Sequence, residues 1–324
     1  MQPFVAKMRT RVIVAAIAGA TMTSAARAAD HLNVGDPSVQ AFSFVALDIG
    51  LKYGLFQKYG IEFDRISVSG SAKLHQAMTA NSIDIGVGSG SDMAFLVKGA
   101  PEIAVAAMAG PPLLFGFDVR YDAPYKGPAD LKGARFGIST VGSSTEWMVR
   151  RLAQQQGWAP SDYTMITVGA ETPGQTAALL TNQIDVVVSS ASLGFNLDEQ
   201  KKGKMLFPAS EVVKTFMLHT IYASSGMVKD HPDQIRRFLQ GWFDTIAYMR
   251  THKPETVEAQ RARTHFSQVV EDREYDLVMP MFSDTGKFDP AALQVLEDSF
   301  IDLKILDTKP DLTKYLTEDF LPKK

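Results

Sequence analysis

The chain of 324 residues contains no cysteine. This absence excludes disulfides, cysteine-ligated zinc, iron–sulfur clusters and a thiolate nucleophile. It also excludes a lipid-modified cysteine behind an export signal. A large excess of either sign of charge is also missing. The 33 Lys and Arg nearly balance the 36 Asp and Glu, and the formal net charge is −3. The chain as a whole therefore offers no basic field, and we expect no nucleic-acid partner.

Long apolar runs are missing too. The apolar run at 12–20 is well short of the roughly 20 residues that a membrane span needs. It follows Lys7, Arg9 and Arg11 without any acid, and the small residues Ala26-Arg27-Ala28 come after it. This order is typical of a secretory signal peptide over residues 1–28, cleaved after Ala28. A disordered or amphipathic N-terminus is the alternative.

Cleavage after Ala28 would change the charge of the protein. The removed segment holds four cations and no acid, which leaves 29 cations against 36 acids and a net charge of −7. No later stretch of the sequence is long and apolar enough to span a bilayer. We therefore expect an exported mature protein that depends on its own core for stability.

Familiar catalytic and metal-binding motifs are not found. The six histidines are scattered, without HExxH or a close pair, and neither GxSxG nor a Walker loop occurs. The glycines at 86–90 begin inside an expected strand and lack the third glycine of a dinucleotide loop. His75, alone on an amphipathic helix, is expected to be a surface residue or one satisfied by neighbours. The sequence therefore predicts neither a metal, a cofactor nor an enzyme.

Alternating strands and helices are present instead. The hydrophobic pattern predicts an α/β fold with a largely parallel sheet. In the first part of the chain we expect strands at 32–38, 61–68, 83–89 and 103–109, and helices at 44–59, 71–80 and 92–98. The length allows two domains or one large one.

The same order restarts near residue 130. We expect strands at 134–139, 163–169 and 184–189 and helices at 143–156 and 174–181, the first with Ser143 at its N-cap and Glu146 three residues on. At an offset of 101, Asn81 meets Asn182, and Ile83-Asp84 meets Ile184-Asp185. The repeat predicts two similar lobes, with chance similarity between helix–strand units as the alternative.

Helices dominate the last third of the chain. After a strand at 216–223, helices begin at Pro232, Pro254 and Pro290. We expect them to return to the first lobe, so that the chain crosses between lobes near 113–121 and again near 216–223. This gives a first lobe of residues 29–118 and 222–324, and a second lobe of residues 119–221.

Loops of small polar residues recur where expected strands end and helices begin. In open α/β sheets, ligands bind at the carboxyl ends of strands, where helix N-termini offer free N–H groups. Plain N-capping is the alternative for each serine, and a place in the core is the alternative for Trp147. The candidate ligand-binding residues are Asp36, Ser38, Phe42, Ser69, Ser71, Ser89, Ser91, Asp92, Thr140, Ser143, Ser144, Thr145, Trp147, Glu171, Ser190 and Ser192.

Several stretches carry a family resemblance. They are GLKYGLF at 50–56 with GIE at 60–62, NSIDIG at 81–86, DLKG at 130–133 with FG at 136–137, QIDV at 183–186 and HPD at 231–233. With the signal peptide and the doubled lobe, the chain resembles the periplasmic substrate-binding proteins of ABC importers. It is most similar to the nitrate/sulfonate/taurine and thiamine-precursor-binding (NMT1-like) family, over about residues 32–245.

The resemblance implies a periplasmic binding protein-like type II fold, with two α/β lobes, a hinge and two crossovers. It implies a monomer in the periplasm that captures a small neutral or anionic organic ligand between its lobes. The protein would then deliver this ligand to an ABC permease and ATPase complex, without covalent chemistry. The candidate loops contain no Arg or Lys, and Lys73 and Arg120 are the nearest cations. This favours a neutral or weakly charged ligand with aromatic or carboxylate character.

Two other functions stay open. The family's fold also serves a pyrimidine synthase and menaquinone-pathway enzymes, so an exported enzyme is one alternative. The synthase-like branch uses a cysteine-rich segment, which this chain lacks. A sensory binding protein that feeds a receptor is the other alternative.

Overall fold

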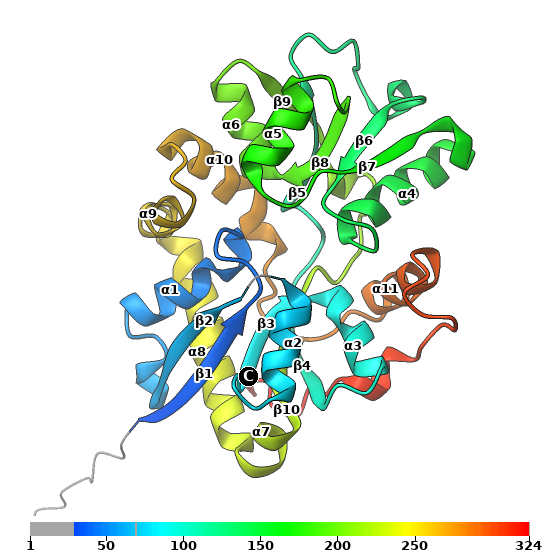
Figure 1. Cartoon of the computed structure of the whole chain (residues 1–324). Helices are drawn as coiled ribbons and strands as arrows, with labels where there is room; N and C mark the ends of the chain where they lie inside the picture. The colour runs from blue at the N-terminus through cyan, green and yellow to red at the C-terminus, as the bar shows by residue number, and fades with distance from the viewer. Residues whose placement is uncertain (1–28, 69, 324) are drawn as a thin grey trace, which may run out of the picture.

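The structure is a computed structural model that describes residues 29–68 and 70–323. The predicted signal peptide, its cleavage site and Ser69 lie outside the described residues. Figure 1 shows the described chain as two lobes, one above the other, each with a twisted sheet and helices around it.

Each lobe is built on a five-stranded sheet. The first sheet has the order β2-β1-β3-β10-β4 and the second β7-β6-β8-β5-β9. The strands of the first are β1 (Asp30–Asp36), β2 (Ile61–Ser67), β3 (Ile85–Ser89), β4 (Glu102–Ala109) and β10 (His219–Ser224). Those of the second are β5 (Phe115–Arg120), β6 (Arg135–Ile138), β7 (Thr164–Thr167), β8 (Val186–Ser190) and β9 (Gly203–Pro208).

The sheets are mixed rather than wholly parallel. In each, four strands run in the same direction, and one strand, β10 or β5, is antiparallel to both of its neighbours. The α/β prediction is confirmed. The helices are α1 (Val45–Lys52), α2 (Ser71–Thr79), α3 (Met93–Val97), α4 (Ser144–Gln156), α5 (Thr172–Leu180), α6 (Ala191–Glu199), α7 (Ser225–Asp230), α8 (Pro232–Thr251), α9 (Lys253–Thr264), α10 (Gln268–Val278) and α11 (Pro290–Asp302).

The internal repeat in the sequence corresponds to the same local structure in both lobes. Asp84 accepts a hydrogen bond from the backbone N–H of Asn33 (2.8 Å), and Asp185 accepts one from the backbone N–H of Arg135 (2.9 Å). The asparagine three residues before each aspartate has a positive φ, 57° in the first lobe and 61° in the second. Both aspartates thus fasten the start of a strand to its neighbour in the same way, as the offset of 101 predicts.

The chain passes between the lobes through residues 110–114 and 212–218. The predicted boundaries at 118 and 222 cut through β5 and β10, whose residues pair within the second and the first sheet respectively. The predicted boundaries fall in these strands because each strand adjoins a crossover in the sequence. In the structure, β5 and β10 each lie between two other strands of a sheet. The crossovers touch at Gly110, where a Cβ would lie 2.0 Å from the carbonyl oxygen of Phe216.

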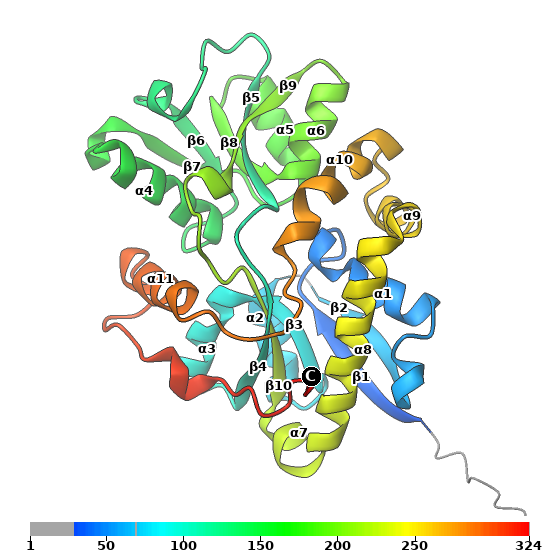
Figure 2. The same cartoon turned by 180° about the vertical axis from the view of Figure 1, so that it is seen from behind.

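The C-terminal helices do not all return to the first lobe. Helices α8 and α9 pack on α1, as predicted, but α10 packs on both α9 and α6 of the second lobe. Figures 1 and 2 show α10 in this position between the lobes. No helix of the described chain has both the length and the apolar character that a membrane crossing requires.

Candidate ligand cleft

A cavity of about 610 Å³ lies between the lobes. It is in the range of sites for small organic molecules. Fourteen serine and threonine residues line it together with five phenylalanines, so its wall can bind both polar and apolar groups. Twelve of the sixteen candidates line it: Ser38, Phe42, Ser71, Ser89, Ser91, Asp92, Thr140, Ser143, Ser144, Thr145, Ser190 and Ser192.

The other four candidates are placed elsewhere or not described. Trp147 is a core residue, 1% exposed, and its ring stacks on Phe216 with the centroids 4.7 Å apart. Asp36 is buried outside the cavity lining, where it pairs with Arg65 (2.7 Å). Glu171 is exposed at the N-cap of α5 and does not line the cavity. Ser69 is not among the described residues.

Many of the lining serines also cap helices. The hydroxyl of Ser89 accepts a hydrogen bond from the N–H of Ser91, and that of Ser190 accepts one from the N–H of Leu193. Ser143 caps α4 in the same manner, as predicted. The carboxylate of Glu146, however, accepts from the N–H of Gly142 (2.6 Å) rather than from that of the cap residue. Capping and cavity lining are therefore combined in the same side chains.

A buried trio of charged residues stands behind one wall of the cavity. Oδ2 of Asp92, which lines the cavity, accepts a hydrogen bond from the N–H of Ser89 (2.9 Å) and lies 3.3 Å from Nε2 of His75. Nδ1 of His75 lies 2.6 Å from Glu102. Burial alone would lower the pKa of His75, but the two carboxylates outweigh it and raise the pKa to about 9. His75 is thus buried, with a carboxylate close to each nitrogen of its ring.

His219 is a lining residue that sequence reasoning missed. It lies at the start of β10, and its ring meets that of Phe44 edge-on at 5.1 Å. Burial lowers its pKa to about 3, so its imidazole is neutral near pH 7. The sequence carries no local signal for this role, because the antiparallel insertion of β10 brings the histidine to the cleft.

The C-terminal helices supply a third wall of the cavity. Thr264, Phe266 and Glu274 line it from the end of α9, the turn that follows and α10. Burial raises the pKa of Glu274 well above its usual range, and the neighbouring carboxyl of Glu271 raises it further. Ser192 of the second lobe lines the same cavity. Sequence reasoning missed this wall because it assigned all of these helices to the first lobe.

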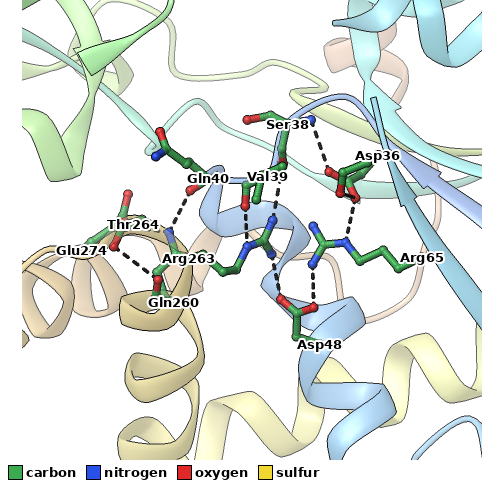
Figure 3. Close-up of polar contacts among 11 residues, drawn as sticks. Asp36, Ser38, Val39, Gln40, Asp48, Arg65, Gln260, Arg263, Thr264 and Glu274 are labelled. Carbon is green, nitrogen blue, oxygen red and sulfur yellow. Dashed lines mark hydrogen bonds and ion pairs between the residues drawn. The ribbon is translucent and has the colours of Figure 1, made fainter. Parts of the chain in front are cut away.

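Helix α9 also holds the loop of residues 37–41, part of which lines the cleft (Figure 3). Arg263 donates to the carbonyl oxygens of Ser38 and Val39 and pairs with Asp48 (3.1 Å). Gln260 donates to the carbonyl oxygen of Gln40 (2.9 Å). Three backbone carbonyl oxygens thus fix the loop against one helix, so its position depends on the C-terminal part of the chain.

Helix α10 is fastened to the second lobe as well. Arg273 donates to Asp198 (2.7 Å), and its guanidinium lies 4.3 Å from the ring centroid of Phe195. Ser267 donates to Glu199 (2.8 Å). Asp198, Phe195 and Glu199 all lie on α6. The α9–α10 pair therefore connects the lobes beside the two crossovers.

Cationic side chains are few in the cleft. Lys98, which is exposed, is the one Lys or Arg among the described lining residues. Of the cations expected nearby, Lys73 does not line the cavity, and Arg120 donates to the carbonyl oxygens of Leu179 and Ile184. The described residues contain no group of three or more His, Cys, Asp or Glu side chains that could hold a metal ion.

The sequence matches a family profile, and the fold matches solved structures. Residues 42–257 match the profile of the family described as NMT1/THI5 like. Among curated proteins, no sequence matches this chain.

Solved structures with the same fold have low sequence identity to this chain. The periplasmic aliphatic sulphonate binding protein SsuA from Escherichia coli matches with a TM-score of 0.75 at 16% identity, over 88% of this chain and 91% of that one. The alkanesulfonate-binding protein SsuA from Xanthomonas axonopodis pv. citri, bound to MOPS, matches at 0.72 and 15% identity, over 89% and 98%.

An enzyme shares the fold too. A cysteine-to-serine mutant of DszB in complex with biphenyl-2-sulfinic acid matches with a TM-score of 0.67 at 16% identity, over 90% of this chain and 97% of that one. Together with the two sheets, these likenesses confirm the predicted type II periplasmic binding protein fold. They show the fold and leave the ligand undefined.

Proposed function

This chain belongs to the NMT1/THI5-like family, and on that premise we propose that it is the substrate-binding component of an ABC importer. It captures a small organic ligand between its lobes and delivers it to a membrane permease with its ATPase. The observation that carries the proposal is the cavity of about 610 Å³ between the lobes, lined by helix starts and strand ends from both.

Ligand capture works through a shift between open and closed states. A ligand that touches Ser89 and Ser91 in the first lobe and Ser190 and Ser192 in the second makes all of these contacts only when the lobes are closed. It therefore stabilises the closed state, which the permease recognises. Residues 110–114 and 212–218 serve as the hinge, because they are the two crossovers of the chain.

The place of action is the periplasm, with the protein exported by residues 1–28 and cleaved after Ala28. The order of basic, apolar and small residues supports export, and the SsuA protein of Escherichia coli is described as periplasmic. We propose a freely diffusing monomer, since the chain has no cysteine for a lipid anchor.

The ligand is organic and neutral or weakly charged. Fourteen hydroxyl side chains and five phenylalanines line the cavity, but Lys98 is the one Lys or Arg among the described lining residues. Both SsuA proteins are named as sulfonate-binding proteins. A cleft with so little positive charge is a poor match for that anion, although backbone N–H groups at helix starts can hold an anion without a basic side chain.

An enzyme of the same fold is the second candidate, favoured by the likeness to DszB. The solved DszB mutant has a cysteine replaced by serine, and this chain has no cysteine at all. A thiol could therefore play no part in any reaction here. A sensory binding protein that passes the ligand to a receptor would share the cleft and differ only in its membrane partner.

A thermal-shift screen of small nutrients tests the proposal. A binder at 100 times its dissociation constant adds about 2.7 kcal/mol to the free energy of unfolding. Each hit is then incubated with the purified protein and followed by mass spectrometry. We expect hits that stay chemically unchanged. Turnover of a hit would favour the enzyme, and a screen without hits would contradict ligand capture.

A further inference from the structure

The carboxylate of Asp92 is buried in the cavity wall. The residue is 3% exposed, and it lines the cavity. Its contacts with the N–H of Ser89 and with His75 both engage Oδ2, so Oδ1 is the oxygen available to a molecule in the cavity. Gly88 makes room for this carboxylate, because a Cβ there would lie 2.8 Å from Oδ2 of Asp92.

The surroundings of Asp92 leave negative charge uncompensated. The trio of His75, Asp92 and Glu102 joins two carboxylates to one imidazolium, an excess of one negative charge when all three are ionised. His219 adds no positive charge because it is neutral, and Lys98 is exposed to solvent. A buried carboxylate with a free oxygen requires a donor, preferably a charged one.

Aromatic rings line the same cavity as this carboxylate. Phe95 follows Asp92 by three residues, across the start of α3, and lines the cavity. The His75 ring stacks on Phe95 with centroids 4.8 Å apart, which fixes the phenyl ring. Phe44 lines the same cavity. An organic cation gains from both kinds of neighbour, since aromatic faces attract cations and carboxylates pair with them.

We propose that the ligand of this cleft is a small organic cation whose ammonium or amidinium nitrogen donates a hydrogen bond to Asp92. The inference rests on the proposed function, capture of a small organic ligand for import, and assigns that ligand a full positive charge in place of a neutral or weakly charged character. A sulfonate at the same place would be desolvated beside a carboxylate of like charge, which is strongly unfavourable. The hydroxyl groups of the opposite lobe hold the polar remainder of the ligand.

The test uses compounds that differ in charge but share a ring. Benzylamine and benzamidine are the cations, benzyl alcohol is the neutral compound, and benzoate and benzenesulfonate are the anions. A matched aliphatic set pairs butylamine with butanol and butanesulfonate. Binding is measured by thermal shift and calorimetry for the wild type, for Asp92→Asn and for Asp64→Asn, which changes an exposed carboxylate on β2.

We expect the cations to bind the wild type and Asp64→Asn equally and to bind Asp92→Asn at least about 30-fold more weakly, the loss typical of a buried charge-assisted pair. Benzyl alcohol should not distinguish the variants. If Asp92→Asn does not fold, Phe95→Leu provides the second variant, with cation affinity lowered about 3- to 30-fold by the missing aromatic face.

Two results would contradict a cationic ligand, and only the second would also contradict ligand capture. Sulfonates or carboxylates that bind the wild type, and bind Asp92→Asn as well or better, would leave ligand capture intact and refute the cationic class. Absence of binding by every compound in the panel and in the nutrient screen would refute ligand capture, and the cationic class with it.

Discussion

The contacts between α10 and α6 should control how easily the lobes separate. Arg273→Ala removes both the hydrogen-bonded ion pair with Asp198 and the guanidinium over Phe195. The ion pair contributes only about 0.5 kcal/mol, because the side chains are 43% and 27% exposed and solvent screens them. The cation–π contact contributes about 0.5–1 kcal/mol. The variant should therefore shift the equilibrium toward separated lobes by about five- to tenfold.

Single-molecule fluorescence energy transfer can measure this shift without a ligand. The chain has no cysteine, so dyes can be attached at Thr79→Cys on α2 and Gln156→Cys on α4 without removing native thiols. Both positions are exposed, one in each lobe. The ratio of molecules with the longer to molecules with the shorter interdye distance should rise about five- to tenfold in Arg273→Ala.

Arg236→Ala provides the matched control. The Arg236 guanidinium also lies over an aromatic ring, 5.3 Å from the ring centroid of Phe320. This contact does not join the two lobes. The control should leave the distance distribution unchanged. Equal distributions for Arg273→Ala and the wild type, or an equal shift in the control, would refute the role of α10 as a connection between the lobes.

Three further outcomes are expected. The pKa of His75 is raised from 6.5 to about 9 on folding, so its stabilisation of about 3 kcal/mol should be present below pH 6.5 and lost as the pH rises to 9. The difference in the free energy of unfolding between wild type and His75→Gln, measured by denaturation, should thus decrease by about 3 kcal/mol between pH 6.5 and pH 9. A difference that does not change with pH would contradict this. Trp147→Phe should lower the melting temperature, because the smaller ring buries less area against Phe216, but keep the ligand affinity. A binding loss at unchanged stability would place Trp147 in the site. Gly90→Ala should destabilise the fold by more than about 1 kcal/mol in urea titrations, since its Cβ would lie 1.9 Å from the backbone oxygen of Met217. An unaltered midpoint of unfolding would contradict this close contact.

Local sequence patterns predicted the repeated unit well. The aspartates at 84 and 185 and the strands and helices around them depend on neighbours within one unit, so periodicity and turn residues are sufficient to find them. Twelve candidate residues line the cavity for the same reason: the carboxyl ends of parallel strands share one edge of a sheet.

The remaining features depend on contacts between distant segments. His219 and Glu274 reach the cleft because β10 enters the first sheet from the other lobe and α10 packs on α6. No local pattern encodes either arrangement. Trp147 illustrates the opposite error, since its place in the first turn of α4 fits the cleft and the core equally, and only the ring of Phe216 on the return crossover decides between them.

Capture of an unchanged ligand is the central claim, and equilibrium dialysis against a mixture of small metabolites tests it most directly. Mass spectrometry of both compartments should show one compound enriched with the protein, up to one equivalent, at a mass identical to that of the compound supplied. Loss of a compound with the appearance of a new mass would show an enzyme instead. No enrichment of any compound would contradict the binding of a ligand between the lobes.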